Sequence, residues 1–224
     1  MSLAAFQAAL CAMTLDAGLA AQVRREGEPA LGHWQLTALE QRRLVAVARQ
    51  AGMALNCTLA RANRFAAVHD AFAMSCVLLG PALRPVLDAL WSSQQPRNYQ
   101  LSGDVERFAA TVTAQVLAAD APDGLLGEPQ RTYLRDVLAY EAQAYALALG
   151  VRHVPDPEHA NSPATWVDFA HDPQPLFEAL QRFVQPPANL PLARHRVRLA
   201  LRDGELETTI FGVQDGPAPA AASR

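Results

Sequence analysis

The sequence predicts an α+β protein, with a mainly helical N-terminal body followed by a small three-stranded antiparallel sheet with one helix. From Thr37 to Gly150, apolar residues recur at the three- and four-residue spacing of amphipathic helices. After Gly150 prolines interrupt that pattern, and stretches of alternating apolar and polar residues follow. We therefore expect a helical domain over residues 1–150, a small αβ module over 151–215 and a disordered tail over 216–224.

Helix signals dominate the first 80 residues. Four apolar residues at helical spacing predict a first helix: Leu3, Phe6, Leu10 and Met13. Thr37 and Glu40 form a capping-box pattern at the next helix start, and Gly52 predicts the end of that helix. A further helix is expected to run to the Gly80–Pro81 break. Its apolar residues are Leu55, Leu59, Phe65, Val68, Phe72, Val77, Leu78 and Leu79.

Three more helices complete the predicted body. The first restarts at Pro81 and buries Leu83, Val86, Leu87, Leu90 and Trp91. Ser102 is expected to cap the second helix, and residues 121–124 are expected to end it. The apolar stripe of this helix is Val105, Phe108, Val112, Val116 and Leu117. The last helix is expected to stop at Gly150. It carries Tyr133, Leu134, Val137, Leu138, Glu141, Tyr145 and Leu149.

The C-terminal third has strand and turn signals. Residues 165–170 alternate like a strand, Asp172 precedes a helix as its cap, and Pro186 with Pro187 is expected to end that helix. Residues 195–201 and 206–211 predict a hairpin that turns at Asp203 and Gly204. A sheet this small leaves an edge open, to which an extended peptide could add.

Composition limits the class of protein. Half of the 224 residues are apolar and 18% are charged, which is typical of a soluble globular chain. A net charge of −3 argues against a nucleic-acid partner. All 19 basic residues are arginine, so a Schiff-base lysine is excluded. We find no apolar run approaching the roughly 18 residues of a membrane-spanning helix, and an odd cysteine count fits a reducing cytoplasm.

No residue pattern predicts catalysis or metal binding by this chain. The six histidines form no HExxH or comparable pair, so we expect solvated or locally bonded side chains: His33, His69, His153, His159, His171 and His195. Cys57 and Cys76 lie in apolar helical runs, where a buried thiol is the usual interpretation. We therefore expect no catalytic residue, no metal and no cofactor in the chain itself.

Polar residues interrupt one apolar helix and form a first candidate site. They are Asn56, Arg61, Asn63 and Arg64. The two arginines are three residues apart and share a helix face. They could bind a carboxylate in a bidentate arrangement. Asp136 and Glu141 on a later helix are candidate acceptors. An internal network between packed helices and a partner interface are both open as interpretations.

The hairpin is the second candidate site. Val197, Leu199 and Leu201 predict a core face, and the arginines between them predict a solvated basic face. The hairpin edge could also take up an extended peptide by β-augmentation. The candidate peptide-binding residues are Arg196, Val197, Arg198, Leu199, Leu201, Leu206, Thr208 and Ile210.

Several stretches resemble the helical partner proteins of multinuclear non-haem iron-dependent oxidases. They are Arg61–Arg64, Leu78–Gly80, Leu83, Leu87, Phe108 and Thr132–Glu141, within residues 55 to 149. The short chain, the NCTLARANR segment and the terminal hairpin most resemble the MbnC branch of that family, which acts in methanobactin biosynthesis.

The resemblance implies a function in complex with other chains. It implies a heterodimer with an MbnB-like iron-dependent oxidase, which carries the iron. It also implies binding of the leader of an MbnA-like precursor peptide, whose cysteines are converted with O2 to oxazolone and thioamide groups of a copper chelator. The hairpin residues would hold that leader.

Alternative functions remain open. A related iron oxidase could modify a different peptide. Helices followed by a hairpin also describe a winged-helix DNA-binding regulator, although net acidity counts against one. A stand-alone enzyme would have to use Cys57 or the histidine-containing loop.

Overall fold

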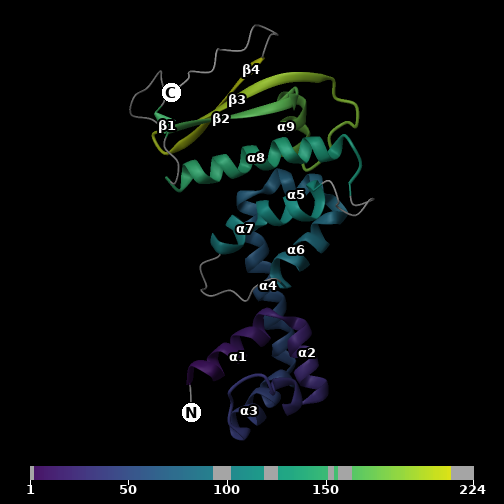
Figure 1. The fold of residues 1–224 in the computed structure, drawn as a ribbon, viewed down its shortest axis with the longest axis vertical. Coiled ribbons are helices and arrows are strands. Elements are labelled where there is room, and N and C mark those ends of the chain that lie inside the picture. Colours follow the sequence, from purple (N-terminus) through teal and green to yellow (C-terminus); the bar gives the residue numbers. More distant parts are fainter. Residues whose placement is uncertain (1–2, 93–101, 119–125, 151–153, 156–162, 213–224) are drawn as a thin grey trace. The chain divides into compact units, whose positions relative to one another are not determined.

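The computed structural model describes residues 3–92, 102–118, 126–150, 154–155 and 163–212 (Figure 1). The chain forms two compact units. Unit 1 comprises Met1–Ala67 and Trp91–Asp104, and unit 2 comprises Val68–Leu90 and Val105–Arg224. The chain therefore passes from one unit to the other inside α4 (Ala51–Ala71), inside α6 (Leu83–Ser92) and inside α7 (Ser102–Val112), and the helix over Gln130–Ala148 belongs to the same unit as the sheet.

Unit 1 is a small helical cluster. Its elements are α1 (Leu3–Leu15), α2 (Ala17–Glu26), the 3-10 turn η1 (Glu28–Leu31), α3 (Ala38–Ala48) and most of α4. The Asp16 carboxylate caps α2 by accepting hydrogen bonds from the amides of Gly18 and Leu19. Met13, Val23, Leu31 and Leu44 are fully buried and form the centre of its core.

The start of α3 is confirmed and its end is corrected. Thr37 and Glu40 form the expected capping box. The helix ends at Ala48, however, and Gly52 lies inside the first turn of α4. Arg49 and the following residue make the break, with the Arg49 amide still bonded to Val45. The Gly52 backbone is helical, so this glycine does not act as a stop.

The helix expected to run from residue 55 to 79 is two helices. It breaks at Phe72, where φ is −134° and ψ is 43°, between α4 and α5 (Ala73–Leu79). Leu55 and Leu59, expected in the core, are 60% and 52% exposed. The 3-10 turn η2 (Gly80–Ala82) then leads into α6 (Leu83–Ser92), and Gly80 adopts the positive φ of 47° that suits glycine.

The remaining helices follow the expected order. Helix α7 (Ser102–Val112) continues as the π-helical turn η3 (Thr113–Leu117), and α8 (Gln130–Ala148) ends beside Gly150, whose φ is 68°. The Ser102 side chain and residues 121–124 lie outside the described part of the chain. The expected stripes are buried except at their ends, where Leu149 is 53% exposed.

The run Ala73–Trp91 corrects one expectation, because by length and composition it could cross a membrane. The bent pair α1 and α2 passes the same test only if both are counted as one span. The run consists of α5, η2 and α6, and Leu78, Leu79 and Leu90 within it are fully buried. Core helices of globular proteins pass this test as well.

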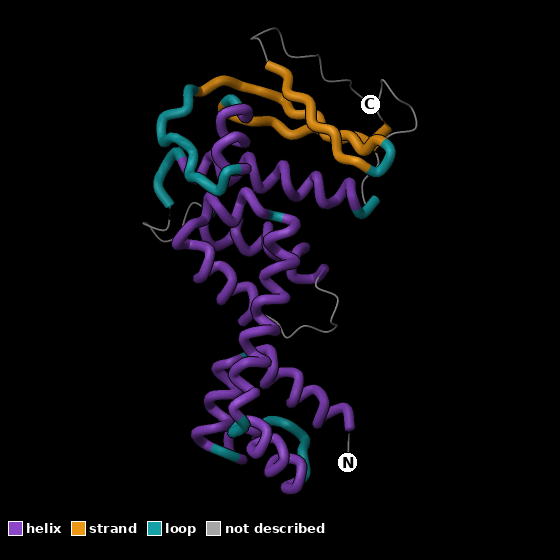
Figure 2. The backbone as a smooth tube through the Cα atoms, turned by 180° about the vertical axis from the view of Figure 1, so that it is seen from behind, coloured by secondary structure: helices purple, strands orange, loops and turns teal. Residues whose placement is uncertain are grey.

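The sheet has the three predicted long antiparallel strands, which confirms the α+β class. They are β2 (Pro163–His171), β3 (Leu192–Arg202) and β4 (Glu205–Gly212), in the order β1-β2-β3-β4 with the two-residue β1 (Val154–Pro155) at one side. Helices α8 and α9 (Pro173–Gln181) pack on one face of the sheet (Figure 2). The expected hairpin turn is confirmed, with φ of 53° at Asp203 and 86° at Gly204.

Helix α9 begins at its predicted cap and ends before the predicted stop. The Asp172 carboxylate accepts a hydrogen bond from the Gln174 amide. The helix ends at Gln181, five residues before Pro186. Phe183 adopts a φ of 57°, and the Val184 amide bonds to the Ala179 carbonyl, which is the geometry of a Schellman end. Here a phenylalanine takes the place that glycine usually fills, so no residue type at this position marks the end of the helix.

Candidate functional site

Strand β4 forms one edge of the described sheet. It pairs with β3 on one side, and no other described strand pairs with it. Seven of its eight residues are exposed, and Ile210 is half-buried. An exposed strand of this length presents a row of main-chain groups to which another extended chain can bond.

The turn determines which main-chain groups of β4 face outward. Because a two-residue turn joins Arg202 to Glu205, these two residues exchange both hydrogen bonds of the ladder. The bonded pairs then alternate along the strands, so every second β4 amide points away from β3. The outward groups belong to Leu206, Thr208, Ile210 and Gly212. Three of these four are sequence-predicted peptide-binding residues.

The other predicted peptide-binding residues lie on β3, which is an internal strand. Strand β3 pairs with β2 and with β4, so its main-chain groups already serve the ladder. Val197 and Leu199 are fully buried on the helix-covered face, and Leu201 is half-buried. These residues position β4 and cannot themselves pair with an incoming peptide.

Three of the four β3 arginines are paired or buried. Arg196 Nε bonds Asp168 Oδ1 at 2.9 Å, and Arg202 lies 3.3 Å from a Glu207 carboxylate oxygen. Arg198, expected in solvent, is 8% exposed. The edge therefore offers main-chain hydrogen bonding more than positive charge.

An exposed aromatic pair lies on the sheet face opposite α8. The rings of Trp166 and Phe211 are 5.4 Å apart, and both side chains are more than 40% exposed. The Arg196 guanidinium lies 6.0 Å from the Trp166 ring centre. The pairing of the strands brings these residues together, and the alternation in residues 165–170 was the one sequence signal that could have found Trp166.

Tyr140 supports β4 from the helix-covered face. Its hydroxyl lies 2.9 Å from Thr208 Oγ1, and its ring packs on Phe177 and Phe169. Burial raises the pKa of the Tyr140 hydroxyl, so the neutral form that can donate this bond is favoured. Sequence reasoning did not select Tyr140, although it lies within the α8 segment that carries the family resemblance.

The polar residues of α4 separate into different environments. Arg64 is 3% exposed and binds Asp104 with both Nε, at 2.6 Å, and Nη2, at 2.9 Å. Arg61 is half-buried, and its guanidinium lies 5.9 Å from the Trp91 ring centre. Asn56 and Asn63 are exposed. The internal-network interpretation therefore describes Arg64, with Asp104 as an acceptor that sequence reasoning missed.

Asp136 and Glu141 bind backbone amides instead of those arginines. Glu141 accepts hydrogen bonds from the Met74 and Ser75 amides at 2.7 and 2.9 Å and so caps α5. Asp136 accepts one from the Ala170 amide of β2 at 2.8 Å. Burial raises the pKa of both carboxyls, that of Glu141 to about 7. Both residues tie α8 to other elements of unit 2.

The cysteines and the histidines that the structure describes show no arrangement for chemistry, and His153 and His159 lie outside the described residues. Burial raises the pKa of the Cys57 thiol, which donates a hydrogen bond to the Met13 carbonyl, and raises that of Cys76 to about 12. A raised pKa disfavours the thiolate that a nucleophile needs. His171 is buried with the Tyr133 ring edge-on at 4.8 Å. Within the described ranges, no group of three or more His, Cys, Asp or Glu side chains could hold a metal ion.

Comparison with known proteins finds no matching family model, no matching curated protein and no matching solved structure.

Proposed function

We propose that this chain is the non-catalytic partner subunit of an MbnB-like iron-dependent oxidase and binds the leader of an MbnA-like precursor peptide. In this role it supports the O2-dependent conversion of precursor cysteines to oxazolone and thioamide groups in methanobactin biosynthesis, in the cytoplasm. The observation that carries the proposal is the exposed β4 edge, with its outward main-chain groups at Leu206, Thr208 and Ile210.

A leader peptide can bind this edge as an additional antiparallel or parallel strand. Main-chain hydrogen bonds supply affinity in β-augmentation, and side chains on alternate positions supply selectivity. A peptide beside β4 would place alternate side chains near Phe211 on one face and near Leu206 on the other, both of which are exposed. The low net charge of the edge fits a peptide that is recognised by its backbone and apolar side chains.

The chemistry in this proposal belongs to the oxidase. The iron lies in the oxidase, and this chain contributes the leader-binding edge and a surface for the heterodimer. Of the α4 residues assigned to that surface, Asn56 and Asn63 are exposed and Arg61 is partly so, whereas Arg64 is occupied by Asp104. The exposed residues are therefore the ones that can contact the oxidase.

Co-purification tests this function. The tagged chain is expressed with and without an MbnB-like oxidase, and the product is analysed by light scattering and for iron. We expect a heterodimer that contains iron only when the oxidase is present. Addition of an MbnA-like precursor and O2 should then yield the oxidised peptide, and a related precursor that reacts faster would identify a different peptide substrate. A chain that stays monomeric beside a folded oxidase contradicts the proposal.

A further inference from the structure

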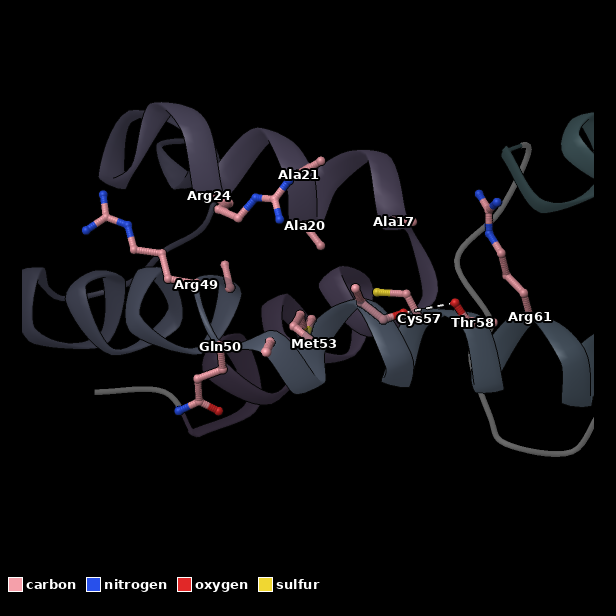
Figure 3. A pocket seen from close by; sticks show the side chains of 13 residues that line it. Ala17, Ala20, Ala21, Arg24, Arg49, Gln50, Met53, Cys57, Thr58 and Arg61 are labelled. Atoms are coloured by element: carbon pink, nitrogen blue, oxygen red, sulfur yellow. Dashed lines mark hydrogen bonds between the residues drawn. The ribbon is translucent and has the colours of Figure 1, made fainter.

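A groove in unit 1 shares only Arg61 with the α4 surface proposed above for the oxidase, and its other lining residues have no part in that function. It lies between α2 and the α3–α4 junction and has a volume of about 310 Å³ (Figure 3). Most of its lining side chains are small or apolar, and Figure 3 shows Met53 and Cys57 at its base. Six alanines and two uncharged polar residues also line it: Ala17, Ala20, Ala21, Ala48, Ala51, Ala54, Gln50 and Thr58.

The charged residues of the groove are all arginines. Arg24, Arg49 and Arg61 line it, and no aspartate or glutamate does. In Figure 3, Arg24 lies over the groove, with Arg49 toward one end and Arg61 toward the other. The described residues offer none of the three an ion pair, and Arg61 Nε is buried without a hydrogen-bond acceptor. The groove is therefore electropositive, with donors that nothing in the described chain satisfies.

Two carboxylates of this unit are engaged by other groups. The Asp16 carboxylate accepts hydrogen bonds from two amides at the start of α2. The buried Asp104 is bound to Arg64. Arg64, which stabilises the fold, has a buried carboxylate partner. The three groove arginines lack one.

An exposed apolar stripe adjoins the groove. Leu55 and Leu59 are 60% and 52% exposed and lie one turn apart on α4. On a helix with 3.6 residues per turn, Leu55 is about 40° around the axis from the groove residue Ala51. The surface thus combines a cationic groove with a neighbouring pair of exposed leucines.

We propose that this surface binds an acidic amphipathic helix of a partner protein. Its carboxylates would pair with Arg24, Arg49 and Arg61, and its apolar side chains would cover Leu55, Leu59 and the alanines that line the groove. Charge complementarity selects this partner, because a neutral or basic helix would leave the groove arginines unpaired. Helix-in-groove recognition needs apolar anchors one turn apart, as the two leucines provide.

Fluorescence anisotropy on the full chain tests the proposal with two synthetic probes. Both are labelled helices of about 18 residues, long enough to be partly helical alone. The acidic probe has a leucine stripe flanked by glutamates, and its neutral twin has glutamine at each glutamate. We expect the acidic probe to bind at least about tenfold more tightly than the neutral one.

Three variants separate groove binding from general attraction. The triple variant Arg24→Gln, Arg49→Gln, Arg61→Gln should weaken binding of the acidic probe about tenfold or more. The matched variant Arg25→Gln, Arg42→Gln, Arg43→Gln removes the same charge at exposed arginines outside the groove and should leave binding within about twofold. Ala54→Trp keeps every charge and should block the groove, because Ala54 lines it and is exposed, so the larger side chain extends into the groove and not into the core.

Each other outcome overturns the proposal. Equal weakening by both triple variants would mean nonspecific attraction of an acidic peptide. Equal binding of the acidic and neutral probes would mean that charge does not contribute to recognition. Equal binding of the acidic probe to Ala54→Trp and to the parent chain would mean that the probe does not bind in the groove. Self-association of the chain that Ala54→Trp abolishes, measured by light scattering, would make a second copy the occupant instead.

Discussion

The bidentate ion pair between Arg64 and Asp104 is the clearest single-residue contribution to unit 1. Both side chains are at most 4% exposed, so removal of Arg64 takes the guanidinium away from a buried carboxylate. We expect Arg64→Ala to lower the free energy of unfolding by about 3–5 kcal/mol. Urea unfolding followed by tryptophan fluorescence measures this loss.

Arg84→Ala is the matched control for that substitution. Arg84 is 90% exposed and lies 4.0 Å from Asp88 in an i,i+4 pair, so its loss should cost about 0–1 kcal/mol. The apolar double variant Arg64→Met, Asp104→Leu should recover most of the stability, because it removes both buried charges together. Equal losses in the two single alanine variants would contradict a structural role for the buried pair.

Glu141 predicts a pH dependence of stability. Its folded pKa of about 7 lies above the usual value of 4.5, so the folded chain holds this proton more tightly than the unfolded chain. The stabilisation is complete below about pH 4.5 and is lost as the pH rises through about 7. Relative to Glu141→Gln, the parent chain should therefore lose about 3 kcal/mol across this range. Urea unfolding of both chains at several pH values tests the sign; a constant difference would contradict it.

The partners of these residues could not be read from the sequence. The spacing of Arg61 and Arg64 identified a polar interruption in an apolar helix, and Glu141 was selected as an acceptor for these arginines but binds backbone amides instead. The acceptor Asp104 is 40 residues from Arg64, and the amides that Glu141 binds are more than 60 residues away. Such pairings depend on how helices pack, which periodicity within one helix does not contain.

At the scale of elements, local signals predicted the hairpin and caps well. The Thr37 capping box, the Asp172 cap and the Asp203–Gly204 turn depend on neighbouring residues only, and all three are confirmed. The break at Phe72 was missed because the capping carboxylate of α5 comes from α8. Helix α2 was missed as well, although Asp16 before its first turn was a usable signal.

The β4 edge predicts a difference between two substitutions at one residue. Thr208→Pro removes an outward amide and the hydroxyl that lies near Tyr140, whereas Thr208→Val removes only the hydroxyl. A proline whose missing N–H faced solvent leaves the β3 ladder intact. We expect the proline variant to bind a labelled leader peptide at least about tenfold more weakly than the valine variant, measured by anisotropy. Equal binding by two folded variants would move the leader away from this edge.

At the scale of the whole molecule, the division into two units was not predictable from composition. The change in pattern after Gly150 suggested a boundary there, but α8 is tied to the sheet by Asp136, Tyr140 and Thr208. The chain first passes between the two units within the continuous α4, where no proline, glycine or polar linker marks the passage. Contacts distant in sequence therefore decide which helices form a unit with the sheet.

The winged-helix alternative predicts that the chain binds DNA, and the charges on α9 and the hairpin argue against such binding. A DNA reader needs basic side chains on the helix that enters the groove and on the hairpin beside it. Helix α9, which precedes the hairpin, has no arginine and one glutamate, and two hairpin arginines are paired with Asp168 and Glu207. With a net charge of −3, we expect no measurable binding of a labelled random duplex at about 0.15 M salt. Binding that weakens steeply with added salt would instead favour the regulator, because phosphate contacts release counterions.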